Sequence, residues 1–148
     1  MKRLILVIVV IWAHTALAQT PHEVQQILDI NNNVPDMLYR FEPDYLSIAT
    51  GETVRFLGTV RGQTVHSVRD MLPDGADKIA IMPRDNPDVT FTVPGVYGIR
   101  CMKHARHGMV TLIVVGNDYP NLAAVRAAVP KGLNWFAHPK MYRLLDRA

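Results

Sequence analysis

Three side chains that can bind a soft metal ion lie on one short segment near the C-terminal third of the sequence. They are the thiol of Cys101, the imidazole of His104 and the thioether of Met109. Sulfur donors combined with imidazole suit copper, and a Cys with His ligands and a weak axial Met is the donor set of an electron-transfer copper site. The Cys-x2-His-x4-Met spacing therefore predicts a copper site with three ligands on a single loop.

A site of this kind needs a second histidine from another part of the chain, and His66 is the candidate. Each residue alone is weak evidence, because an isolated Cys is most often a small buried hydrophobe.

His22 and His138 have no ligand spacing and are predicted to lie at the surface or near a terminus. His107 lies inside the loop and could compete for the metal. Met109 completes the spacing, so His107 is predicted to face solvent beside the site.

Other chemistry fits the sequence less well. Zinc sites usually combine Cys and His without Met, and the chain has no Cys-x2-Cys pair, no Gly-rich phosphate loop and no Cys-x2-Cys-His haem motif. A Cys/His hydrolase is conceivable from the residue types, but no oxyanion-hole motif accompanies them. Copper binding is the chemistry that the pattern favours.

The N-terminus predicts export. Lys2 and Arg3 precede the apolar run Leu4–Trp12, and Ala16–Ala18 is a small-residue cleavage site, which together are typical of a secretory signal peptide. The mature chain would begin at Gln19. A membrane anchor is the rival interpretation, but the run from Leu4 to Ala18 contains His14 and is shorter than the ~20 residues that span a bilayer. We expect a periplasmic location.

The charge and the cysteine count limit the partners. The whole chain has 16 basic and 13 acidic residues, and removal of Lys2 and Arg3 leaves 14 basic residues against 13, a net charge of +1. We expect no nucleic-acid partner, no stable membrane insertion and a monomer. A single cysteine in an exported protein is paired between chains, reactive or occupied, and ligation to a metal would protect it.

Short apolar segments of period two predict a mainly β fold. Pro21–Ile30 fits either a first strand or a short helix. The expected strands are Met37–Phe41, Leu46–Ile48, Thr53–Leu57, Asp88–Val93, Val96–Arg100 and Val110–Val115. Strands this short, separated by turns, indicate a β-sandwich or barrel.

The C-terminal part has a different character. Asn121–Val129 is Ala-rich with helical spacing and is expected to stop at Pro130, and a second helix is expected from Pro139 through Leu145. We therefore expect a single domain over residues 19–148, with two short helices within about 120–148 packed on the β-sandwich.

Several segments resemble pseudoazurin, within the cupredoxin family. They are Phe41-Glu42-Pro43, Gly51–Val54, Met71–Ala76, Thr90–Gly98 and Gly108–Val110, and the two C-terminal helices distinguish the pattern from plastocyanin. The resemblance implies a Greek-key sandwich with one type 1 (blue) copper ion held by His66, Cys101, His104 and Met109. It also implies electron transfer with periplasmic redox enzymes such as nitrite reductases.

Two positions depart from the family. Lys103 stands where a Pro is usual and restores a backbone N–H, from which we expect a hydrogen bond to the Cys101 sulfur that stabilises Cu(I) and raises the potential. Ser67 stands where an Asn commonly ties the two ligand segments together, and it is expected to do so less well. Lys103, Arg106 and His107 make the loop basic, which would steer acidic partners toward it.

Three functions remain open at this point. The first is a mobile one-electron carrier that turns over no substrate of its own. The second is a periplasmic copper-binding or delivery protein that holds Cu(I) through Cys101, the histidines and Met109. The third is a structural or interaction module on a degenerate fold, which the departures at Lys103 and Ser67 leave possible.

Overall fold

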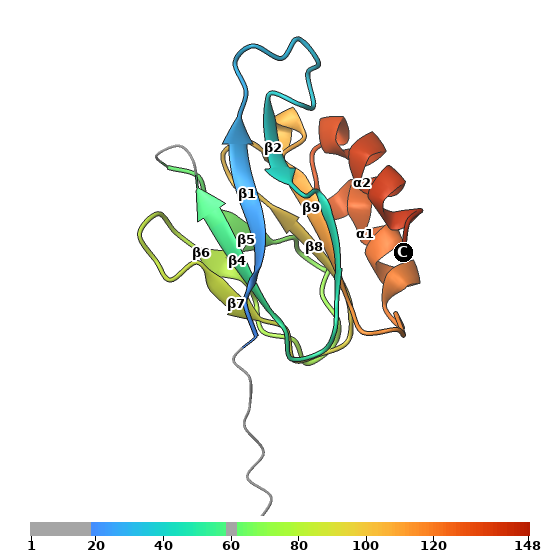
Figure 1. Cartoon of the computed structure of the whole chain (residues 1–148). Coiled ribbons are helices and arrows are strands. Elements are labelled where there is room, and N and C mark those ends of the chain that lie inside the picture. The colour runs from blue at the N-terminus through green and yellow to red at the C-terminus, as the bar shows by residue number, and fades with distance from the viewer. Residues whose placement is uncertain (1–18, 59–61) are drawn as a thin grey trace, which may run out of the picture.

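The computed structural model describes residues 19–58 and 62–148, which form two β-sheets with a pair of helices packed against one of them (Figure 1). The predicted signal peptide and its cleavage motif lie outside the described residues. In the part of the chain that the structure describes, no helix combines the length and the apolar composition needed to cross a membrane.

The strands divide between a four-stranded and a five-stranded sheet. In the first, the order β2-β1-β4-β7 is formed by β1 (His22–Leu28), β2 (Tyr39–Glu42), β4 (Thr53–Gly58) and β7 (Asp88–Thr90). In the second, the order β3-β9-β8-β5-β6 is formed by β3 (Tyr45–Ile48), β5 (Val65–Ser67), β6 (Ala80–Ile81), β8 (Gly95–Arg100) and β9 (Val110–Val115). Neighbours in each sheet are often distant in sequence, as in a Greek-key sandwich.

Two α-helices and two short 3-10 helices complete the described part of the chain. They are η1 (Ala105–His107), α1 (Leu122–Gly132), η2 (Trp135–Ala137) and α2 (His138–Leu145). The mainly β sandwich with two C-terminal helices is confirmed. The ambiguous segment near the N-terminus is strand β1, which pairs with β2 on one side and β4 on the other.

Two boundaries differ from the sequence prediction. The strand expected over Asp88–Val93 ends at Thr90, just before Phe91, whose N–H bonds to the Glu52 carbonyl (2.9 Å). Helix α1 continues through Pro130 to Gly132, although a proline outside the first turn removes an i→i−4 hydrogen bond and its ring crowds the carbonyl four residues earlier. The Leu133 N–H then closes the last turn on the Val129 carbonyl (3.1 Å).

The five-stranded sheet is buried on both faces. Its inner face packs on the four-stranded sheet, through residues that include Val65, Ile99 and Cys101, and its outer face packs on α1 and α2, through residues that include Val96 and Leu112. Side chains alternate between faces along a strand. Consecutive residues of β8 therefore belong to different cores, and this alternation decides which side chains can meet at the loop that follows.

Two side-chain contacts fix helix α1 to the outer face of the sheet. The Asn121 side chain accepts a hydrogen bond from the Val96 N–H and donates one to the Val96 carbonyl, both 2.8 Å. The Arg100 guanidinium donates to the Gly132 carbonyl at the end of α1 (3.0 Å). Between these two contacts, Gly98 lies against Met71 of the loop after β5, where a Cβ atom would come within 2.7 Å of the Met71 side chain. Helix α1 is thus held to β8 at Val96 and at Arg100.

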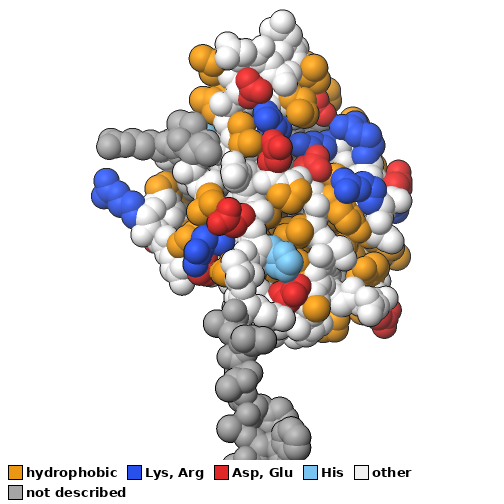
Figure 2. All heavy atoms as spheres, viewed as in Figure 1, with side chains coloured by type: hydrophobic (Ala, Val, Ile, Leu, Met, Phe, Trp, Pro, Cys, Tyr) orange, Lys and Arg blue, Asp and Glu red, His pale blue; other side chains and the backbone are white. Residues whose placement is uncertain are grey.

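Charges are mixed on the face of the molecule that carries the four-stranded sheet. Figure 2 shows acidic, basic and hydrophobic side chains side by side there, without a field of one sign. One of the pairs behind this pattern joins Arg55 and Asp88 across β4 and β7, with two hydrogen bonds of 2.7 Å. The Arg55 guanidinium lowers the pKa of the Asp88 carboxyl by donating these hydrogen bonds to it and by its positive charge. This face therefore offers a partner no patch of one charge.

Candidate metal centre

The loop from Cys101 to Met109 is closed by its own backbone. The Ala105 N–H bonds to the Cys101 carbonyl (2.9 Å), and the Cys101 N–H bonds to the Met109 carbonyl (3.2 Å). The Met109 N–H returns to the His104 carbonyl (3.2 Å). Gly108 ends η1 in the left-handed region, with φ +82°, a conformation that glycine adopts without strain. The chain therefore leaves β8 and enters β9 with three potential donors held on one compact turn.

Cys101 and His104 lie in direct contact. The Cys101 Sγ is fully buried and lies 3.5 Å from the His104 Nδ1. Bonds of about 2.3 Å to thiolate and about 2.0 Å to imidazole are usual for a transition-metal ion in a Cys/His site. Two donors 3.5 Å apart can therefore share one ion at an open angle, so this pair fits a copper ion.

Met109 completes the loop's contribution. Its side chain is fully buried and belongs to the same core between the sheets as Cys101.

The His104 ring is close to several basic side chains. Burial lowers the pKa of His104, and electrostatic interactions with His107, Lys103 and Arg106 lower it further. These effects favour the neutral imidazole, the form in which it can bind a metal ion.

A tyrosine from the other sheet covers the His104 ring. Tyr39, at the start of β2, stacks on His104 with ring centroids 3.9 Å apart and an interplanar angle of 6°. Tyr39 also touches the His107 ring in a tilted arrangement (5.4 Å), and the His107 Nε2 accepts a hydrogen bond from Arg106 (3.2 Å). Sequence reasoning did not identify Tyr39, because an aromatic residue at a strand start carries no ligand signal.

The structure does not bring His66 to the other three predicted ligands. His66 pairs with Arg100 in the β5–β8 ladder, and residues directly opposite in an antiparallel pair have side chains on the same face. Arg100 alternates with Ile99 and Cys101, which belong to the core between the sheets. His66 therefore lies on the outer face with Arg100, and Cys101 lies on the inner face.

The surroundings of His66 agree with this placement. Its pKa is lowered by burial and then by the positive charge of Arg100, a neighbour that would also repel a cation. The His66 Nε2 is buried and has no hydrogen-bond partner among the described residues. Over residues 19–58 and 62–148, no group of three or more His, Cys, Asp and Glu side chains forms a cluster that could hold a metal.

Thr64, and not Ser67, ties the upstream segment to the loop. The Thr64 Oγ1 accepts a hydrogen bond from the Met102 N–H (3.1 Å) and lies 3.9 Å from the Cys101 Sγ. The Ser67 hydroxyl instead accepts a hydrogen bond from the Ile79 N–H (3.2 Å). The tie expected at Ser67 is therefore made three residues earlier, where Thr64 precedes the strand and can turn toward Cys101.

The environment of the sulfur also differs from the expectation at Lys103. Among the described residues, the polar groups within hydrogen-bond distance of the Cys101 Sγ are the Thr64 hydroxyl and the His104 ring. The Lys103 backbone N–H is not one of them. The Lys103 side chain instead lies beside Gly62, where a Cβ atom would come within 2.6 Å of the Lys103 Nζ. The upstream segment and the loop are therefore in contact on both sides of Gln63.

Similarity to known proteins agrees with this geometry. The sequence model of the copper binding proteins of the plastocyanin/azurin family matches residues 28–116, a range that includes the loop and the segment before β5. The chain belongs to this family. Members of the cupredoxin family bind one type 1 copper ion, and three loop residues of this chain, Cys101, His104 and Met109, fit such an ion.

Several individual relatives are pseudoazurins. The chain is 35% identical over 96 residues to the pseudoazurin of Methylorubrum extorquens, a match that covers 65% of each chain. It is 33% identical over 92 residues to that of Paracoccus pantotrophus, covering 62% of this chain and 63% of the relative. These matches span just under two thirds of either relative.

The folds agree over a greater length. The crystal structure of pseudoazurin from Methylobacterium extorquens AM1 superposes with a TM-score of 0.75 at 29% identity, covering 86% of this chain and 98% of that one. The resemblance to pseudoazurin that the sequence predicted is confirmed, and family membership together with the fold supports a copper electron carrier.

Proposed function

We propose that this protein is a mobile one-electron carrier that binds one copper ion through Cys101, His104 and Met109. The observation that supports this most directly is the contact between the Cys101 Sγ and the His104 Nδ1, 3.5 Å apart at the end of a buried strand. A type 1 copper ion supplies one-electron chemistry by alternating between Cu(I) and Cu(II) in one geometry. The chain's task is to hold its donors still while the charge changes.

The fold restrains each donor differently. Cys101 is fixed by burial and by its backbone bond to Met109, so the thiolate cannot follow the metal outward. His104 is restrained by the Tyr39 ring stacked on it. Little rearrangement is then needed when an electron arrives or leaves. The arrangement favours electron transfer over substrate turnover, and we assign no enzymatic activity to it.

The surface beside His104 suits a partner with acidic groups. Lys103, Arg106 and His107 surround the histidine, and the Met102 side chain among them is 53% exposed. A positive rim speeds encounter with a negatively charged partner, and salt weakens the effect. We propose that the partners are periplasmic redox proteins with acidic docking surfaces, a nitrite reductase being one candidate. We further propose that the carrier acts as a monomer after export and removal of residues 1–18.

Addition of Cu(II) to the purified mature protein tests the metal site. The expected result is a strong visible thiolate-to-copper charge-transfer band at one copper per chain, absent from the Cys101→Ser variant. Serine is close to cysteine in size, and denaturant unfolding of the Cys101→Ser apoprotein shows whether the variant folds. Copper binding without a Cys101-dependent band would contradict the carrier and favour a delivery protein.

A second experiment tests the docking surface. Electron transfer to an acidic redox protein is expected to slow as ionic strength rises, and the Lys103→Ser and Arg106→Ser variants should flatten that dependence. The Arg55→Ser variant is the control, because Arg55 lies on β4 and is engaged by Asp88. A salt-independent rate in the wild type would contradict the proposed role of Lys103, Arg106 and His107 in attracting the partner.

A further inference from the structure

The loop supplies three donors, and the copper site needs one more from a different segment. His66 was the sequence candidate, yet it shares the outer face of the sheet with Arg100. To reach the inner face it would have to move against the register of β5 and β8, since a one-residue slip is what exchanges the faces of a strand. The fourth donor must therefore come from a side chain on the Cys101 side of the sheet.

The segment Gly62–Thr64 is the part of the chain that meets the loop there. Thr64 contacts the Cys101 sulfur and the Met102 N–H, and Gly62 lies against the Lys103 ammonium group. Gln63 stands between these two contacts. Its side chain is only 5% exposed, so its carboxamide lies inside the protein although the segment is a loop.

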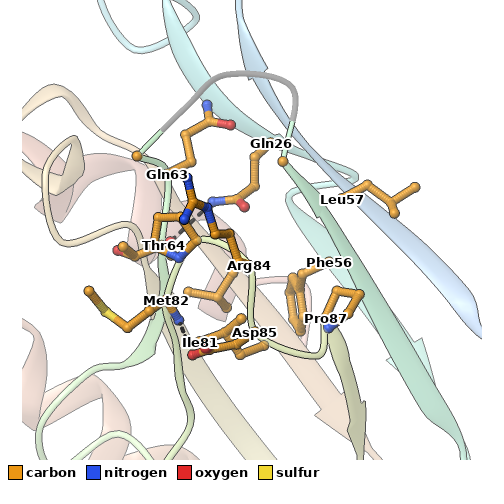
Figure 3. A pocket seen from close by; sticks show the side chains of 14 residues that line it. Gln26, Phe56, Leu57, Gln63, Thr64, Ile81, Met82, Arg84, Asp85 and Pro87 are labelled. Carbon is orange, nitrogen blue, oxygen red and sulfur yellow. Dashed lines mark hydrogen bonds between the residues drawn. The ribbon is translucent and has the colours of Figure 1, made fainter.

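The carboxamide of Gln63 is close to other polar groups of the same kind. A Cβ atom at Gly58 would lie 3.8 Å from the Gln63 Oε1 and 3.5 Å from the Gln26 Oε1. Figure 3 shows Gln63 and Gln26 side by side above Thr64, at one end of a cleft of about 390 Å³. The Gln26 amide donates to the Thr64 carbonyl (3.0 Å), which holds the segment in place from the strand β1 side.

We propose that Gln63 supplies the fourth donor of the copper site through its carboxamide oxygen, and that His66 is not a ligand. This rests on the proposed copper site of Cys101, His104 and Met109. A glutamine oxygen is a known ligand of copper in sites with a Cys thiolate. Thr64 is less suited to the role, because its hydroxyl already accepts the Met102 N–H. The resulting set has two sulfur donors, one oxygen donor and a single imidazole.

The number of imidazoles distinguishes this site from one that uses His66. Pulsed EPR of the Cu(II)-loaded mature protein counts coordinated imidazole rings through the remote ring nitrogen. We expect one ring in the wild type, one in the His66→Gln variant and two in the Gln63→His variant. Two rings in the wild type, reduced to one by His66→Gln, would overturn the inference while leaving the Cys101 charge-transfer band, and so the carrier, intact.

Binding measurements provide a second readout. A Cu(II) titration should show at least a tenfold loss of affinity in Gln63→Ala, an increase in Gln63→His and less than a twofold change in His66→Gln. Denaturant unfolding of each apoprotein shows whether the variants fold, and the Gln63→His variant keeps the test informative if Gln63→Ala does not. An unchanged affinity in a folded Gln63→Ala variant would contradict the role of Gln63. A wild type with no Cys101-dependent band would instead contradict the carrier itself.

Discussion

On β8, Ile99 faces the space between the two sheets, whereas Gly98 and Arg100 face the helices. Cys101 continues the inner series and becomes the buried donor at the strand end. The outer series makes structural contacts with Met71 and with the end of α1. One strand therefore serves chemistry on one face and attachment of the helices on the other, and substitutions on the two faces should have separable effects.

The largest effect on stability is expected on the outer face at Asn121. Its side chain satisfies both the N–H and the carbonyl of the fully buried Val96. Asn121→Ala should cost about 1–3 kcal/mol for each group left without a partner. Urea unfolding of the apoprotein measures this, and the visible copper band of the folded variant should match the wild type. A change in the band comparable to that of an inner-face variant would break the separation between the faces.

Gly98→Ala adds a methyl group to the same outer face. The new Cβ would lie 2.7 Å from the Met71 Cε and 2.9 Å from the Met71 Cβ, so Met71 must move. Overpacking of this kind typically costs about 1–3 kcal/mol, to be measured by denaturant unfolding. Gly58→Ala is the matched control, because its Cβ would meet nothing closer than 3.5 Å. Equal stability of the two variants would show that the outer core is loosely packed at Met71.

On the inner face, Thr64→Val should affect the metal site more than the fold. It removes the hydroxyl beside the Cys101 sulfur and leaves the Met102 N–H without its acceptor. We expect a loss of about 1 kcal/mol and a shift of the copper charge-transfer band in the visible spectrum. Ser67→Ala is the control, because Ser67 bonds to Ile79, and its band should not shift. A shift in Ser67→Ala alone would restore Ser67 as the tie between the segments.

The last effect, expected at Tyr39, is mainly on the mobility of the His104 ring. Tyr39→Leu removes the ring stacked on the imidazole, an interaction worth about 0.5–1.5 kcal/mol beyond buried area. NMR of the apoprotein should show the His104 ring resonances broadened or averaged, while Tyr39→Phe, which keeps the stack, should leave them as in the wild type. Identical His104 resonances in all three proteins would show that the loop alone fixes the ring.

The sequence predicted the loop better than it predicted the partner segment. Cys101, His104 and Met109 lie on one turn that is closed by its own backbone hydrogen bonds, so their spacing in the sequence is enough to predict that they lie close together. The choice of His66 rested on residue type, and residue type does not reveal which face of a strand a side chain takes. That is decided by the register between β5 and β8, which is a property of two segments and not of either one.

The helices and most strands were also predictable, because the period of apolar residues that indicates a strand or a helix is a property of a single segment. Helix α1 continues past Pro130, and its last turn is closed by the hydrogen bond from the Leu133 N–H to the Val129 carbonyl, which the amino-acid composition does not reveal. Tyr39 was not identified because its contact with His104 joins residues of different sheets. Sequence reasoning was reliable within segments and failed where two segments had to be aligned.

The stack of Tyr39 on His104 limits how portable the metal loop is. Residues 101–109 close on themselves, so grafting them onto another sandwich would transfer three donors in their proper order. The ring that restrains the imidazole belongs to β2 of the opposite sheet and would stay behind. A transplant would therefore need an aromatic residue at the facing position of its host, and a host without one should bind copper with a histidine that is free to turn.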